Sequence, residues 1–266
     1  MSRSSLVLCF CTVAGLALAP LSLFGAENGA SFARRGAYDP ANPSVELFDG
    51  MSGGQIAVKM VVKDSTEARL IITNNTAAPL NVRLPSAFAG VHILAQLGGA
   101  AGGGGGQGVG AGGGAAAGGA GGGGGAGFFS IPAEKITEVK VPCVCLEHGK
   151  PDPRPQMTYE VRPLESVSSS PEVHELVKQL GEGKVSQRVA QVAAWHYNNQ
   201  MSWEELAAKQ IKRLSGETSP YFSAQEMQTA FAFGQAVEKK LEEGTVVEGQ
   251  SLSKAARLAD QLPAKP

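Results

Sequence analysis

A tract of thirty residues, 98–127, contains twenty glycines and interrupts a segment whose flanks have the pattern of β-strands. Glycine and alanine without large apolar side chains cannot bury enough surface to offset the entropy lost when the backbone is ordered. We therefore expect a disordered surface loop, which a fold tolerates because loop-closure entropy grows slowly with length. The tract lacks the Lys-Ser/Thr ending of a phosphate-binding loop, so it predicts no nucleotide site.

The first 26 residues have the organisation of a secretory signal peptide. Arg3 precedes a largely apolar stretch at 6–24, and two small residues end the segment at Ala26. Cleavage there would remove Cys9 and Cys11. No later stretch of the sequence is long and apolar enough to span a membrane. The alternative is that the apolar stretch is retained as a membrane anchor. The sequence predicts a secreted or periplasmic protein of the cell envelope.

Charge and motifs exclude several functional classes. The chain has 23 basic and 24 acidic residues, a formal net charge of −1, so no strong field attracts nucleic acid or a membrane surface. Residues 50–54 match Gly-x-Ser-x-Gly, but a strand follows where a nucleophile elbow needs a helix. We expect no catalytic residues and no cofactor, and an unknown protein or cell-envelope component as the partner.

The pattern after a polar, flexible leader at 27–43 is that of short strands. Apolar residues alternate with other residues in six places, separated by turn signals: 56–62, 68–73, 80–84, 128–131, 139–145 and 157–161. Together they predict a small antiparallel β-sandwich, immunoglobulin-like in style, over residues 44–165, with the glycine tract as a disordered loop.

Helices are expected from residue 166 to residue 244, which makes the predicted fold class α+β. Ser170 followed by Pro171 marks one helix start, a second helix is expected near 186–198, and serine-glutamate capping boxes mark two further starts at 202 and 223. We expect about four helices, the last ending at Gly244. Residues 245–266 read as a loose tail with a short helix near 254–262.

A metal site is one reading of the cysteines. Cys143, Cys145 and His148 are soft or borderline ligands, with His174 or His196 as a fourth. Paired zinc cysteines usually stand further apart than these two. The alternative is one buried structural cysteine and a second that is unbonded or in a disulfide.

Four segments resemble planctomycete-type secreted proteins, a family of unknown function that tends to carry a glycine-rich insertion. The segments are ARLIITNNT (68–76), VRLP (82–85), CLEHGKPDP (145–153) and WEELAAK (203–209). The resemblance covers most of the mature chain and implies export and the two-part layout.

Two shorter segments resemble the signatures of thioester domains in Gram-positive surface adhesins: Val144-Cys145-Leu146 and residues 190–195, AQVAAW. The resemblance implies a covalent-capture module in which the Cys145 thiol bonds to the Gln191 side chain. Such a bond forms when a thiolate attacks the carboxamide and ammonia leaves. The alternative keeps Trp195 in the helical core and makes Gln191 an ordinary polar helix residue.

Helical geometry relates the position of Gln191 to that of Trp195. Gln191 lies about 40° around the helix from Trp195, since four residues at about 100° each overshoot one turn. We expect Trp195 to be buried, which would carry Gln191 towards the junction between strands and helices. We expect Cys145 to be buried alone or linked to Cys143, with Gln191 pointing into water. The sequence then predicts a secreted non-catalytic interaction or structural protein, with covalent capture or metal binding as the alternatives.

Overall fold

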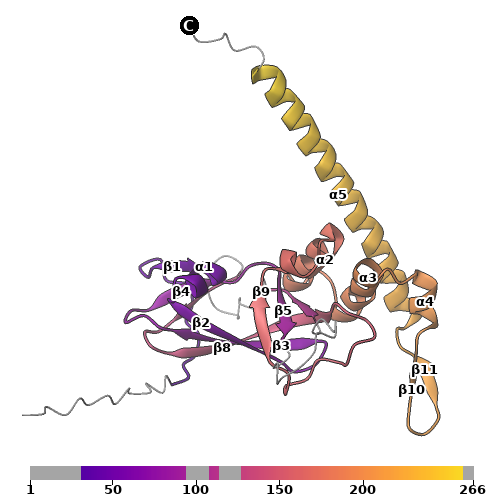
Figure 1. Cartoon of the computed structure of the whole chain (residues 1–266), viewed down its shortest axis with the longest axis horizontal. Coiled ribbons are helices and arrows are strands. Elements are labelled where there is room, and N and C mark those ends of the chain that lie inside the picture. The colour runs from indigo at the N-terminus through magenta and orange to yellow at the C-terminus, as the bar shows by residue number, and fades with distance from the viewer. Residues whose placement is uncertain (1–30, 94–107, 114–126, 260–266) are drawn as a thin grey trace, which may run out of the picture.

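The computed structural model describes residues 31–93, 108–113 and 127–259, so the expected signal peptide lies outside the described residues. A β-rich half is followed by helices, and the long last helix extends away from the body (Figure 1). The elements in chain order are β1 Ser44–Glu46, α1 Leu47–Ser52, β2 Ile56–Val62, β3 Glu67–Asn74, β4 Leu80–Arg83, β5 Phe88–His92, β6 Gly108–Ala111, β7 Phe128–Ile131, β8 Ile136–Cys145, β9 Tyr159–Arg162, a 3₁₀ turn Leu164–Ser166, α2 Pro171–Gly181, α3 Gln187–Asn199, α4 Trp203–Ala208, β10 Gln210–Lys212, β11 Thr218–Pro220 and α5 Ala224–Ala259.

The main sheet is a closed antiparallel barrel of six strands in the order β2-β3-β8-β6-β5-β9. A second sheet, β1-β4-β7, lies beside it. The predicted immunoglobulin-like sandwich is therefore wrong. The mixed α+β composition agrees with the sequence, but the strands close on themselves instead of forming two facing sheets.

The error has its origin in the glycine tract. Residues Gly108–Ala111, read as part of a disordered loop, form β6, which pairs with β5 on one side and β8 on the other. Without β6 these two strands have no common neighbour and the barrel cannot close. Gly-Val-Gly-Ala has little intrinsic strand preference, so local pattern gave no sign of this strand. Residues 98–107 and 114–126 of the tract lie outside the described residues.

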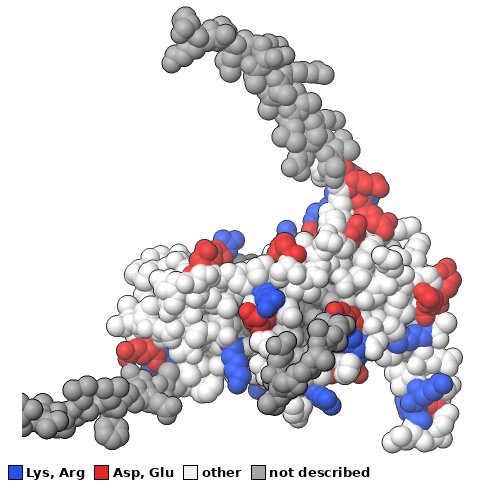
Figure 2. Space-filling view, in the orientation of Figure 1, with Lys and Arg blue, Asp and Glu red and all other residues white. Residues whose placement is uncertain are grey.

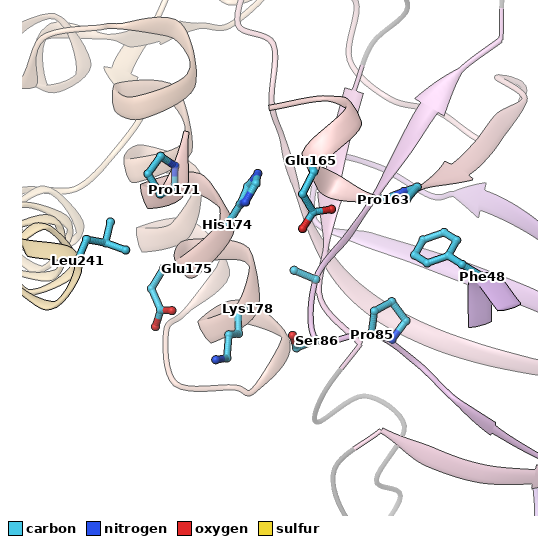
Figure 3. Close-up of a pocket in the computed structure, with 11 residues that line it drawn as sticks. Phe48, Pro85, Ser86, Pro163, Glu165, Pro171, His174, Glu175, Lys178 and Leu241 are labelled. Atoms are coloured by element: carbon cyan, nitrogen blue, oxygen red, sulfur yellow. The ribbon is translucent and has the colours of Figure 1, made fainter. Parts of the chain in front are cut away.

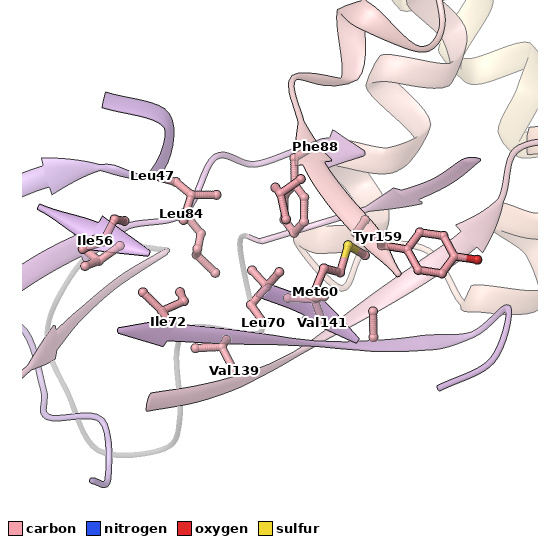
Figure 4. Close-up of a cluster of buried hydrophobic side chains, with 14 of the residues drawn as sticks. Leu47, Ile56, Met60, Leu70, Ile72, Leu84, Phe88, Val139, Val141 and Tyr159 are labelled. Atoms are coloured by element: carbon pink, nitrogen blue, oxygen red, sulfur yellow. The ribbon is translucent and has the colours of Figure 1, made fainter. Parts of the chain in front are cut away.

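The barrel interior is filled by apolar side chains from nearly every strand (Figure 4). Met60, Leu70, Phe88 and Val141 are at most 1 % exposed. Val144 near the end of β8 and Leu146, which follows the strand, belong to a second apolar cluster formed with α2 and α3. The two halves therefore share a packed interface along β8.

The leader and the tail are more ordered than the sequence predicted. From residue 31 the leader lies on the sheets, with Ala33 N–H donating to Ile136 O and Gly36 N–H donating to Ser130 O, both at 2.8 Å. Helix α5 runs through Gly244 to Ala259, so the expected stop at that glycine is wrong. A single helical glycine costs only about 1 kcal/mol and does not by itself end a helix.

The helix starts were predicted well. The Ser170 side chain accepts the Val173 N–H at the start of α2. Both reciprocal bonds of the capping box form at Ser202 and Glu205, which begin α4. No helix among the described residues has the length and apolar character needed to cross a membrane.

Candidate functional site

The end of β8 meets α3 through a row of side-chain amides. Strand β3 pairs with β8 only as far as Glu67 opposite Pro142, and the last backbone bond on this side runs from Cys143 N–H to Thr66 O. Beyond that point no strand of the described residues lies beside this edge of β8, while β6 pairs with its other edge. Four amide residues of α3 bond to the exposed backbone instead: Gln187, Gln191, Asn198 and Asn199.

Gln191 makes the closest of these contacts, and both polar atoms of its side chain take part. Cys145 N–H donates to Gln191 Oε1 at 2.9 Å, and Gln191 Nε2 donates to Cys145 O at 2.8 Å. One carboxamide can make both bonds because the N–H and C=O of an extended residue point to the same side. The structure thus brings together two residues that stand 46 positions apart in the chain.

Gln187, one turn earlier on α3, makes a weaker version of the same contact. Its Nε2 donates to Cys143 O and to Ser65 O, both at 3.2 Å. The Cys143 N–H is already used by Thr66. Of the two cysteines that the structure describes, therefore, Cys145 alone has a carboxamide oxygen at its backbone N–H.

The two thiols differ in their surroundings. Cys143 Sγ lies 3.6 Å from Asp64 O in the apolar barrel core, where burial raises the pKa of the thiol. Cys145 Sγ lies 3.3 Å from Glu147 O. Both residues are buried, and neither is in a disulfide. The nearby Tyr159 also has a raised pKa of about 12, chiefly because of burial.

A cluster of aromatic and cationic side chains, Trp195, His148 and Lys209, lies next to Cys145 and Gln191. The predicted burial of Trp195 is confirmed, at 5 % exposed, and its indole N–H has no hydrogen-bond partner among the described residues. The Lys209 ammonium lies 5.3 Å from the Trp195 ring centre and 2.7 Å from His148 Nε2. Burial, and secondly the Lys209 charge, lower the pKa of His148. The ring is therefore neutral at pH 7 and accepts a hydrogen bond from the ammonium.

The metal reading finds no support in the described residues, which contain no group of three His, Cys, Asp or Glu side chains able to hold an ion. Each histidine of that reading has another partner. His148 faces Lys209, His174 Nε2 lies 2.6 Å from Ser168 O, and His196 Nδ1 lies 2.7 Å from Met201 O.

A cleft of about 550 Å³ separates α2 from the barrel. Figure 3 shows His174, Glu175 and Lys178 on the α2 side, facing Ser86, Pro85 and Glu165 on the other. Two of its polar groups already have partners within the protein: His174 contacts Ser168 O, and Glu175 bonds to Lys240 and Gln179.

Comparison with protein-family models, with curated proteins and with solved structures finds no match. The site must be judged on its own geometry. The thioester resemblance named Cys145 and Gln191, which are in contact. The expectation that Gln191 points into water is wrong, because the unpaired edge of β8 offers its carboxamide a backbone donor and acceptor and buries it at 2 % exposed. Pattern reasoning missed the other amides of α3 and Lys209, because single polar residues on a helix carry no signal of the strand edge they will face.

Proposed function

We propose that the protein is a covalent-capture module in which Cys145 and Gln191 form an internal thioester that reacts with an amine of a partner. The observation that carries this proposal is the placement of the Gln191 carboxamide on the backbone of Cys145 by two hydrogen bonds. Three features of the contact support it: the position of the carboxamide oxygen, the position of its nitrogen and the burial of the pair.

The first feature concerns the carboxamide oxygen. When a thiolate attacks the Gln191 carbonyl carbon, negative charge develops on Oε1, which already accepts the Cys145 N–H at 2.9 Å. A preplaced backbone donor of this kind stabilises the tetrahedral intermediate of acyl transfer.

The second feature concerns the leaving group. Gln191 Nε2 is held at 2.8 Å by Cys145 O, so the departing nitrogen starts from a fixed position. The Cys145 S–H first contacts Glu147 O and must turn about its Cα–Cβ bond to face the carbonyl carbon. The S–C bond then forms, the C–N bond breaks, and ammonia leaves with the proton that the thiol gives up.

The third feature is burial. Cys145 and Gln191 are each 2 % exposed, and exclusion of water protects a reactive acyl group from hydrolysis. In the capture step a partner amine attacks the same carbonyl carbon. An amide bond to the partner forms, and the C–S bond breaks to regenerate the Cys145 thiol.

The structure also contains an observation that favours a second candidate, a secreted non-catalytic interaction protein. Both polar atoms of Gln191 already satisfy backbone groups that the end of β3 leaves exposed. On this reading Gln191 only fastens α3 to β8, as Gln187 does beside it.

A fluorescent primary amine distinguishes the two candidates. The mature protein is incubated with dansylcadaverine, denatured and digested, and the labelled peptide is identified by mass spectrometry. Covalent capture predicts label on Gln191 in the wild type and in Gln187→Ala, and none in Cys145→Ser. Absence of label from the wild type would refute covalent capture and support the fastening role.

A further inference from the structure

Strands β10 and β11 form a two-stranded hairpin of their own that extends from the body between α4 and α5 (Figure 1). Tyr221 N–H donates to Lys209 O at 2.8 Å at its base, and Arg213 N–H donates to Glu217 O at 2.9 Å near its tip. An isolated hairpin is marginally stable in water. This one is held at its base, where the Lys209 ammonium contacts His148 and lies over the Trp195 ring.

The two edges of the hairpin are not equivalent. Bonded and non-bonded pairs alternate along an antiparallel ladder, so Gln210 and Lys212, which lie between bonded pairs, point their N–H and C=O groups away from β11. The opposite edge includes Pro220, which has no N–H. The outer edge of β10 is therefore the edge with a full set of donors and acceptors for another strand.

The hairpin surface combines positive charge with exposed apolar side chains. Residues 209–220 contain three basic residues, Lys209, Lys212 and Arg213, and one acidic residue, Glu217. Arg213 pairs with Glu217 at 3.6 Å and Lys209 is held at the base, so Lys212 is the cation that the outer edge of β10 presents. Blue side chains mark this region in the space-filling view (Figure 2). Leu214 is fully exposed and Ile211 is 43 % exposed.

We propose that the outer edge of β10 binds an extended acidic segment of a partner protein as a third strand. Main-chain bonds to Gln210 and Lys212 would supply affinity, and acidic side chains would meet Lys212 on one face of the hairpin, since Arg213 already pairs with Glu217 at 3.6 Å. Apolar side chains of the segment, on the opposite face, would cover Ile211. A second copy of the same hairpin is a poor occupant because its basic residues repel those of the first. The proposal is independent of the thioester.

The test uses a fluorescein-labelled peptide of alternating valine and glutamate, with a valine-lysine peptide as the control, and fluorescence polarisation as the readout. We expect the acidic peptide to bind and the basic peptide not to bind. Cys145→Ser should bind the acidic peptide as the wild type does, which separates this result from covalent capture. No binding to the wild type, or equal binding of the two peptides, would overturn the proposal.

Two variants test the edge itself. Gln210→Pro removes an outward N–H without removing a hairpin bond, and the preceding Lys209 already has the extended backbone that proline requires. Lys212→Glu reverses a charge. Its matched control is Lys140→Glu, which reverses the charge of an exposed side chain on β8. We expect each hairpin variant to weaken binding at least about tenfold.

The control should bind as the wild type does, and melting temperatures will show whether each variant is folded. Unchanged affinity in Gln210→Pro and Lys212→Glu would overturn the proposal. So would hairpin-dependent binding to phosphatidylglycerol vesicles in place of the peptide, because that result would assign the basic surface to a membrane.

Discussion

Replacing Gly112 by alanine should destabilise the fold, because helix α2 lies directly on the backbone that follows β6. A Cβ atom at position 112 would lie 2.2 Å from Gly181 Cα, 2.4 Å from Gly181 N and 2.8 Å from Val177 O. These obstacles are backbone atoms and cannot move aside as a flexible side chain would. Overpacking usually costs about 1–3 kcal/mol and occasionally more, so we expect about 3 kcal/mol here.

The assay is thermal unfolding of the purified protein followed by circular dichroism. For a domain of this size, about 3 kcal/mol corresponds to a fall in Tm of roughly 6–12 °C. Gly244→Ala is the matched control, because nothing lies within 4 Å of a Cβ at that position in α5. It should gain up to about 1 kcal/mol, since alanine favours helix over glycine. A Gly112→Ala protein that melts with the wild type would refute the direct packing of α2 on the glycine tract.

Two further perturbations test the helix–barrel junction. Trp195→Ala should lower the free energy of unfolding by about 3–5 kcal/mol, measured by urea denaturation, because the ring is buried among aromatic neighbours; an unchanged midpoint would contradict that packing. The pKa of His148 is lowered in the folded protein, so the unfolded chain takes up a proton more readily at this residue. Its stabilising contribution is complete above the unfolded pKa near 6.5 and is lost as the pH falls through the lower folded pKa. When the pH is lowered from 7.5 to 5.5, the urea midpoint should therefore fall by less in His148→Asn than in the wild type. An equal fall in both proteins would show that His148 is not the responsible group.

The sequence predicted those elements whose signals are local. Alternating apolar residues located β2 and β3, and capping residues located the starts of α2 and α4. The closed barrel could not be predicted this way. Its closure depends on β6, whose Gly110 lies close to Val177 of α2, and the next glycine after β6, Gly112, packs on Gly181, about seventy residues further along the chain. The hairpin β10–β11 was missed because Gln210–Lys212 is too short to show a strand period.

The candidate site, too, was predictable only where the sequence signal is local. A short motif was enough to point to Cys145 and Gln191, because the spacing of Gln191 from buried Trp195 placed the amide near the helix–strand junction. The details of the contact depend on where β3 ends relative to β8. That register is a tertiary property, so the sequence alone could not show that the carboxamide would bond to the cysteine backbone.

The most direct test of the proposed thioester is the intact mass of the purified protein, measured under native and denaturing conditions without added amine. The proposal predicts a wild-type mass lower than that of the unmodified chain by one ammonia, and full unmodified masses for Cys145→Ser and Gln191→Ala. Cys143→Ser should keep the loss, because that thiol faces Asp64 O in the barrel core. A wild-type mass equal to that of the unmodified chain would contradict the thioester and leave Gln191 as a hydrogen-bonded fastening between α3 and β8.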